Sequence, residues 1–168
     1  MNKYAALEKN DIINGEGVCV SFWVQGCPHH CPGCFNPETW DFEGGRRLPQ
    51  NIKEQIADAI TENGIQRNFS VLGGEPLCEE NYELTNDICS FVREKFPNIK
   101  IFIWTGEEFE VLKKLSSDLS VVNSILDKAD VLITGPFVQE KKDLTLKLRG
   151  SSNQQIWRKI NGHWIEVY

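Results

Sequence analysis

The stretch NFSVLGGEPLCEENYELTNDICSFVREKF, residues 68–96, combines a short apolar run, a turn and an amphipathic segment. Residues 68–72 have the composition of a strand and lead directly into the turn sequence GGEP. The segment after this turn is predicted to be a helix, because its apolar side chains recur at helical spacing and Pro97 follows them. These side chains are Leu84, Ile88, Phe91 and Phe96. A strand that passes through a tight turn into a helix predicts a βα unit.

The same alternation extends in both directions from residues 68–96. Further strands are predicted at residues 18–24, 99–106 and 129–135, and further helices at 48–64, 107–115 and 121–126. Gly64 suits the C-terminal cap of the first of these helices. Residues 154–168 contain two β-rich runs around Asn161-Gly162, which is a strong hairpin signal. Strands that alternate with helices are typical of an α/β fold with parallel strands and right-handed crossovers.

The composition restricts the class of protein. The chain has 168 residues, of which 40% are hydrophobic and 25% charged, and its net charge is −6. No apolar run approaches the roughly 20 residues that cross a bilayer, and residues 1–17 lack the apolar core of a secretory signal. We therefore expect a cytoplasmic protein with no membrane partner, whose six cysteines serve as thiols or metal ligands. The acidic balance, without a block of Lys or Arg, argues against a nucleic-acid partner.

Three cysteines are clustered in QGCPHHCPGCFNPETW, residues 25–40, with the spacing Cys27-x3-Cys31-x2-Cys34. Three interpretations are open: buried thiols, a structural zinc site, and a four-iron, four-sulfur cluster with one iron left free. The candidates for a fourth zinc ligand are His29, His30 and Cys19. Buried thiols are disfavoured because the polar loop offers little apolar surface, and zinc because no second knuckle of cysteines follows. The spacing favours the cluster.

The GGEP turn, residues 73–76, places two glycines directly after a strand. Without side chains, Gly73 and Gly74 let backbone groups approach a ligand closely, and Glu75 adds an acceptor suited to an ammonium group. In isolation the turn would be interpreted as a plain connection. Ligands of parallel sheets bind beyond the carboxyl ends of the strands, however, so we expect this turn, the cysteine loop and the TG that ends residues 99–106 to converge on one site.

Together, the cysteine spacing and GGEP resemble the radical S-adenosylmethionine (SAM) enzymes. A more specific resemblance, from Asp11 to about Trp157, is to the activating enzymes of anaerobic ribonucleoside-triphosphate reductases. It is carried by NGEGVCVSFWVQGCPHHCPGCFNPETWDFEGG, LGGEPL, WTG and GPFVQEKKDLTLKLRGSSNQ. The stretches GCFNPETWDF and LRGSSNQ are more specific than the cysteine spacing, which the whole superfamily shares.

The resemblance implies two cofactors, a [4Fe-4S] cluster and S-adenosyl-L-methionine. It implies that Cys27, Cys31 and Cys34 ligate the cluster and that SAM chelates the remaining iron. It further implies that Gly73, Gly74 and Glu75 contact the ammonium of SAM and that Gly33, Cys34 and Phe35 contact its adenine. Thr105 would contact the ribose, and Asn36 would lie near the cluster. No catalytic residue beyond the cluster and SAM is implied.

The implied activity is the generation of a glycyl radical on a protein substrate. A one-electron donor such as flavodoxin would reduce the cluster, and reductive cleavage of SAM would give a 5′-deoxyadenosyl radical. This radical would take a hydrogen atom from a glycine in the C-terminal loop of the anaerobic ribonucleoside-triphosphate reductase. A homodimer is left open as the oligomeric state.

The implied fold is a single radical SAM domain over residues 1–168. A complete eight-stranded barrel takes about 250 residues. We therefore expect an α/β fold in the form of a partial, open (βα) barrel of about four to six mostly parallel strands, with a C-terminal β hairpin.

Other functions remain to be weighed against this one. An activase of another glycyl-radical enzyme, such as pyruvate formate-lyase, would use the same chemistry, but CFNPETW and RGSSNQ argue against it. A small-molecule radical SAM enzyme of the deazaguanine synthase type tends to have Asp and Thr where Phe35 and Asn36 stand. A zinc-stabilised binding module would ignore SAM altogether.

The chain departs from the resembling families at three positions. Gly33 stands where many superfamily members have an aromatic residue, Cys19 where an arginine usually follows the NGEG run, and Thr134 where relatives often carry an acidic residue. These departures concern partner docking more than the cofactor site.

The remaining polar residues have less specific interpretations. A weakly structured basic run contains Lys141, Lys142, Lys147 and Arg149. It is a solvated loop, or else a surface for the reductase or the source of an arginine aimed at the SAM carboxylate. We expect Cys78 and Cys89 to be buried structural thiols and Trp23 and Trp104 to belong to the core. His29, His30 and His163 have no evident carboxylate partner in the sequence.

Overall fold

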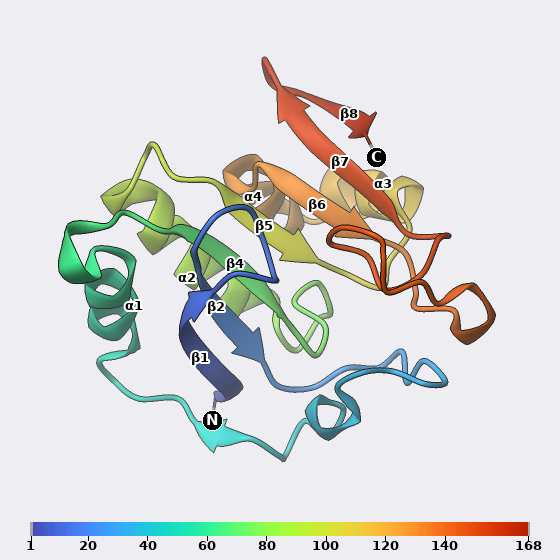
Figure 1. Cartoon of the computed structure of the whole chain (residues 1–168), viewed down its shortest axis with the longest axis horizontal. Coiled ribbons are helices and arrows are strands. Elements are labelled where there is room, and N and C mark those ends of the chain that lie inside the picture. Colours follow the sequence, from blue (N-terminus) through green and yellow to red (C-terminus); the bar gives the residue numbers. More distant parts are fainter. Residues whose placement is uncertain (1, 168) are drawn as a thin grey trace.

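The computed structural model describes residues 2–167, which form one open eight-stranded sheet with four α-helices (Figure 1). The strands are β1 (Lys3–Asp11), β2 (Cys19–Val24), β3 (Arg46–Arg47), β4 (Asn68–Gly73), β5 (Ile101–Trp104), β6 (Val131–Thr134), β7 (Gln155–Ile160) and β8 (His163–Val167). The α-helices are α1 (Ile52–Ile60), α2 (Tyr82–Lys95), α3 (Phe109–Asp118) and α4 (Ser120–Lys128). The strand order across the sheet is β3-β1-β2-β4-β5-β6-β7-β8.

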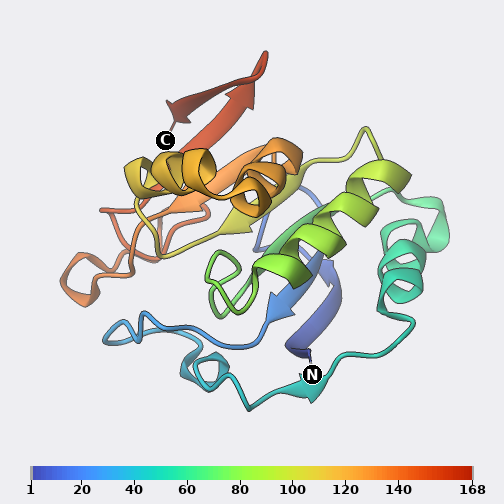
Figure 2. The same ribbon diagram turned by 180° about the vertical axis from the view of Figure 1, so that it is seen from behind.

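The centre of the sheet consists of the parallel strands β2, β4, β5 and β6. Each new strand is added on the same side of the previous one, so right-handed crossovers place every connecting helix on the same face. Figures 1 and 2 show α1 to α4 together on one face of the sheet. The predicted alternation of parallel strands and helices is thus confirmed, as is the C-terminal hairpin of β7 and β8.

The prediction of four to six mostly parallel strands is wrong for the sheet as a whole. Four of the seven neighbouring pairs are antiparallel, because β1 and β3 extend one edge and β7 and β8 extend the other. Strand β1 was not predicted, since its sequence KYAALEKND is rich in charged residues and alanine. Tertiary pairing with the mostly apolar and buried β2 makes this segment a strand.

The helices are close to the predicted segments, with shifted ends. Helix α1 is shorter than predicted and ends at Ile60, because a 3-10 turn (Glu62–Gly64) follows in which Asn63 has a φ of 59° and Gly64 a φ of 72°. Helix α3 continues to Asp118, beyond the predicted end at residue 115. Within residues 2–167, none of the helices has the length and apolar character needed to span a bilayer.

The parallel strands are buried on both faces, as expected for such sheets. Ile101 and Ile103 of β5 belong to the main core, which also contains buried residues of all four helices. Phe102 of the same strand lies in a second cluster with Val131, Ile133 and Ile156, packed by Trp104 and Leu148. The loop before β2 and the segment 135–154 lie over this second face (Figure 1).

Asp11 fixes the loop that connects β1 to β2. Its carboxylate accepts hydrogen bonds from the hydroxyl of Ser21 (2.6 Å) and from the backbone N–H groups of Ile13 (2.8 Å) and Asn14 (3.0 Å). Burial alone would raise the pKa of Asp11, but these hydrogen bonds hold it below the ordinary aspartate value. The ionised form is therefore the one that stabilises the loop.

We predict that Asp11→Ala lowers the free energy of unfolding by about 1–3 kcal/mol, because the buried hydroxyl of Ser21 and two part-buried backbone N–H groups lose their acceptor. Because the folded-state pKa is depressed, this contribution is complete above the pKa of an unfolded aspartate and is lost as the pH falls through the folded value. Urea unfolding of wild type and variant across this pH range measures both effects. Asp58→Ala, at an exposed position of α1, is the control and should stay within about 0.5 kcal/mol of wild type. Equal losses in the two variants would contradict the assignment.

Candidate iron–sulfur site

Three loops meet at the carboxyl ends of the parallel strands, as predicted from the sequence. The cysteine loop follows β2, the GGEP turn follows β4, and Thr105-Gly106 follow β5. Their meeting point is the carboxylate of Glu75, which is only 1% exposed. It accepts hydrogen bonds at Oε1 from the N–H of Leu77 (2.8 Å) and at Oε2 from the N–H of Gly106 (2.7 Å).

His29 of the cysteine loop is the third partner of Glu75, with 2.7 Å between Nε2 and Oε2. The expectation that His29 has no carboxylate partner is therefore wrong. The hydrogen bond to Glu75 raises the pKa of His29 above its ordinary value, although burial opposes the shift. Burial in turn raises the pKa of Glu107, whose Oε1 lies 3.9 Å from the same nitrogen. No sequence signal indicates this pair, since His29 and Glu75 are 46 positions apart.

Glycines bring the backbone of the GGEP turn against the cysteine loop. A Cβ added to Gly74 would lie 2.2 Å from the carbonyl oxygen of Gly26, and Gly73 has a φ of 111°. The N–H of Glu75 donates to the same carbonyl of Gly26 (2.8 Å). The buried amide of Asn81, which the sequence did not indicate, also donates to the carbonyls of Gly26 and Glu75.

The three loop cysteines are free thiols of intermediate burial. The N–H of Cys34 donates to the carbonyl of Cys31 (3.0 Å), and Gly33 between them has a φ of 77°, a conformation that favours glycine. The N–H of Asn36 donates to Sγ of Cys34 (3.4 Å). Burial raises the pKa of the Cys27 thiol to about 11. The loop is thus a series of tight turns that presents three sulfur atoms.

The donor set fits an iron–sulfur cluster better than zinc. Three thiols on one loop are the soft ligands that iron–sulfur clusters use. The thiolates of a cluster bind separate iron atoms, so the three sulfur atoms need not converge on one point.

The proposed fourth zinc ligands are also engaged elsewhere. His29 bonds to Glu75, and His30 stacks on Trp40 with 4.6 Å between the ring centroids. Cys19 is buried at the opposite end of β2, where its thiol donates to the carbonyl of Glu16 (3.4 Å).

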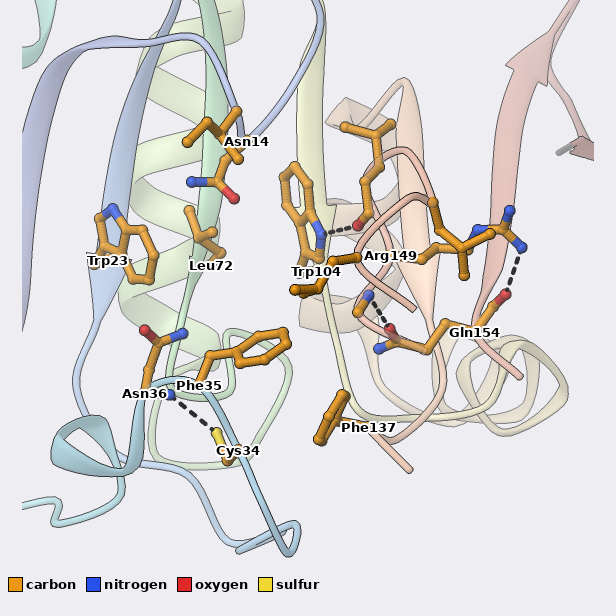
Figure 3. Close-up of a pocket in the computed structure, with 15 residues that line it drawn as sticks. Asn14, Trp23, Cys34, Phe35, Asn36, Leu72, Trp104, Phe137, Arg149 and Gln154 are labelled. Atoms are coloured by element: carbon orange, nitrogen blue, oxygen red, sulfur yellow. Dashed lines mark hydrogen bonds between the residues drawn. The ribbon is translucent and has the colours of Figure 1, made fainter. Parts of the chain in front are cut away.

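A cavity of about 350 Å³ opens beside the cysteine loop (Figure 3). Most of its lining is apolar, which is typical of small-molecule sites. Trp23 of β2 and Leu72 of β4 are paired on neighbouring strands, and Trp104 follows on the next strand, β5, where its indole N–H donates to the carbonyl of Leu148 (2.7 Å). Trp23 and Trp104 were expected in the core; both are instead half-buried and line this cavity.

The structure separates the predicted SAM contacts into two groups. Cys34 and Phe35 line the cavity, as does Asn36, which was expected near the cluster. The other predicted SAM contacts are not among its lining residues: Gly33, Gly73, Gly74, Glu75 and Thr105. Thr105 is buried in the loop after β5, where its N–H donates to the carbonyl of Ile133 (2.9 Å) and its hydroxyl accepts from the N–H of Glu107 (3.1 Å). The cysteine loop reaches both groups, since its His29 bonds to Glu75 and its Cys34 and Phe35 line the cavity.

The segment 135–154 closes the cavity from the side of β6. Phe137 packs against Phe35 at 5.0 Å between centroids, and Lys142 Nζ lies 5.3 Å from the ring of Phe35. Arg149 lines the cavity, and its guanidinium donates to the carbonyl of Gln154 (3.3 Å) rather than pointing at the cysteine loop (Figure 3). As predicted, this segment is weakly structured, and its one described 3-10 turn is Gln139–Lys141.

The remaining cysteines are buried, as expected. The thiol of Cys78 donates to the carbonyl of Glu75 (3.3 Å), and burial raises its pKa to about 12. Cys89 is fully buried in the main core, and burial raises its pKa to about 12 as well. Neither thiol is activated as a nucleophile.

Comparison with known proteins agrees with this site. Residues 13–157 match the family model of the 4Fe-4S single cluster domain, which places the chain in the class of single-cluster iron–sulfur proteins. The chain is also similar to curated proteins named anaerobic ribonucleoside-triphosphate reductase-activating protein. That of Enterobacteria phage T4 is 36% identical over 155 residues, covering 92% of each chain.

Two bacterial proteins of the same name are similar to the same extent. That of Haemophilus influenzae is 35% identical over 156 residues, or 92% of this chain and 97% of its own. That of Escherichia coli K12 is 35% identical over 147 residues, or 87% of this chain and 92% of its own. The chain therefore belongs to the family of anaerobic ribonucleoside-triphosphate reductase-activating proteins.

We predict that Gly74→Ala lowers the free energy of unfolding by about 3 kcal/mol, because the new Cβ meets backbone that cannot rotate away. Gly64→Ala is the matched control: Gly64 has a φ of 72° but open space around its Cβ position. It should therefore show only the backbone strain of about 1 kcal/mol. Urea unfolding of the full-length chain measures both. Losses of the same size would show that the approach of Gly74 to Gly26 is not a constraint.

Proposed function

We propose that this protein is a radical SAM activase that generates a glycyl radical on an anaerobic ribonucleoside-triphosphate reductase. The observation that carries the proposal is the cysteine loop, with three free thiols at the carboxyl ends of parallel strands and the third beside an apolar cavity. Bound at these thiols and reduced by an external one-electron donor, a [4Fe-4S] cluster would supply the electron for reductive cleavage of S-adenosyl-L-methionine and so the radical chemistry that removes a hydrogen atom from a glycine of the reductase.

In this proposal the chain's residues bind and orient the cofactors. Cys27, Cys31 and Cys34 hold the cluster. Gly73, Gly74 and Glu75 receive the ammonium of SAM, and the backbone around Gly33, Cys34 and Phe35 contacts its adenine; Thr105 serves the ribose. Trp23 and Trp104 add an aromatic lining that keeps water from the cavity.

The substrate of this proposal is a protein loop, and the surface around the cavity suits one. Ile13 and Leu144, each 77% exposed, and Phe35, 50% exposed, belong to the cavity lining. Exposed apolar side chains around a cavity are typical of sites that bind other proteins. The reductant is a one-electron donor such as flavodoxin.

In this proposal the protein is one radical SAM domain, and its open sheet is a partial (βα) barrel. It is supported by the one-directional addition of β2, β4, β5 and β6 and by the helices on one face of the sheet.

We predict that alanine at any one of Cys27, Cys31 or Cys34 abolishes cluster binding, because too few thiolates remain. Iron and sulfide per chain after anaerobic reconstitution measure this loss. Cys89→Ala is the control, since Cys89 lies in the core away from the loop, and it should bind iron as wild type does. A loop variant with its full iron content would contradict the ligand assignment.

We further predict a glycyl radical on the reductase when reconstituted protein, a strong reductant, SAM and an anaerobic ribonucleoside-triphosphate reductase are mixed anaerobically. Electron paramagnetic resonance detects it as a doublet, and pyruvate formate-lyase in place of the reductase is the parallel control. SAM cleavage without a doublet on the reductase would overturn the partner but keep the chemistry. Protein that binds no iron would overturn both.

A further inference from the structure

One oxygen atom of Glu75 joins the three loops at the site. His29 lies between Cys27 and Cys31, and its Nε2 is 2.7 Å from Oε2 of Glu75. The N–H of Gly106 reaches the same oxygen at 2.7 Å. The contact therefore ties the cysteine loop to the turn after β4 and to the loop after β5.

The surroundings of His29 hold its ring in this position. A Cβ at Gly106 would lie 2.7 Å from the ring carbon Cδ2 of His29, so the ring packs directly on that backbone. Glu107 lies on another side, with Oε1 at 3.9 Å from Nε2. The next residue, His30, is exposed and stacks on Trp40 instead, so the two adjacent histidines face different partners.

The hydrogen bonds of Glu75 leave one acceptor position unused. An ionised carboxylate offers about four acceptor positions on its two oxygens. His29 and Gly106 take the two on Oε2, and Leu77 takes one on Oε1. Among residues 2–167, no donor takes the remaining position, which is on Oε1.

We propose that His29 is a positioning residue for SAM. Its hydrogen bond to Oε2 of Glu75 fixes the cysteine loop against the two neighbouring loops and keeps Oε1 oriented toward the ammonium of SAM. The inference rests on the proposed function, in which Glu75 receives that ammonium. In this role His29 ligates no iron and transfers no proton.

The test compares His29→Leu, which removes the hydrogen bond, with His29→Gln, which keeps a side-chain N–H donor, and with His30→Leu as the matched control. The full-length chains are reconstituted anaerobically, and iron content, the dissociation constant for SAM by equilibrium dialysis, and the SAM-induced change in the resonance of the reduced cluster are measured. Amide exchange of Gly106 in the metal-free chain reports on the contact without SAM, and circular dichroism verifies folding.

We expect His29→Leu to bind iron as wild type does, to bind SAM about tenfold more weakly and to exchange the Gly106 amide faster. His29→Gln should recover SAM binding to within about threefold, and His30→Leu should match wild type throughout. Unchanged SAM affinity in His29→Leu would overturn the inference, and so would loss of iron, which would make His29 a ligand. A wild-type protein that takes up iron but binds no SAM would instead overturn the proposed function.

Discussion

The arrangement of the site depends on a buried carboxylate. Removing a charged group from water is costly unless hydrogen bonds replace its hydration, and Glu75 is 1% exposed. All three of its donors come from different parts of the site: the turn that carries it, the loop after β5, and the cysteine loop. The sheet alone brings the three loops to the same edge. The hydrogen bonds that the buried carboxylate of Glu75 requires then set the positions of the loops relative to one another.

A second constraint is the absence of side chains where backbones cross. Gly74 approaches the carbonyl of Gly26 so closely that no Cβ could be accommodated, and this approach ties the GGEP turn to the start of the cysteine loop. At Gly150 a Cβ would lie 2.9 Å from the ring of Phe35, in the cysteine loop, and 3.2 Å from the ring of Phe137, in the segment 135–154. The missing side chain of Gly150 thus leaves room for these two rings to pack together. The cysteine loop is therefore packed at both ends, and its three cysteines stay partly exposed.

The sequence predicts the centre of this fold better than its edges. Strands β2, β4, β5 and β6 are short, mostly apolar runs flanked by turns, so local pattern and tertiary environment agree. Strand β1 has no such pattern, because it lies nearer an edge and only two of its nine residues are buried. Its strand conformation comes from pairing with β2, which no local signal reports.

The same distinction applies to the site. The cysteine spacing and the GGEP turn are local, and they indicate the three loops that the structure brings together. Other features of the site arise only from packing between distant segments. They are the pair of His29 and Glu75, the hydrogen bonds from the amide of Asn81, and the cavity lining from Trp104, Phe137 and Leu148. Spacing along the chain cannot predict which donor reaches a buried carboxylate.

Gly33 illustrates how one residue meets local and tertiary demands together. Its φ of 77° forms the turn in which the N–H of Cys34 reaches the carbonyl of Cys31. A Cβ there would also overlap the side-chain oxygen of Gln139, but the end of a glutamine can move aside at little cost. The backbone conformation, and not the contact, is therefore the stronger requirement for glycine. The same turn leads into Phe35, whose ring packs against Phe137 of the segment 135–154, so it also contributes to one contact of that segment beside the cavity.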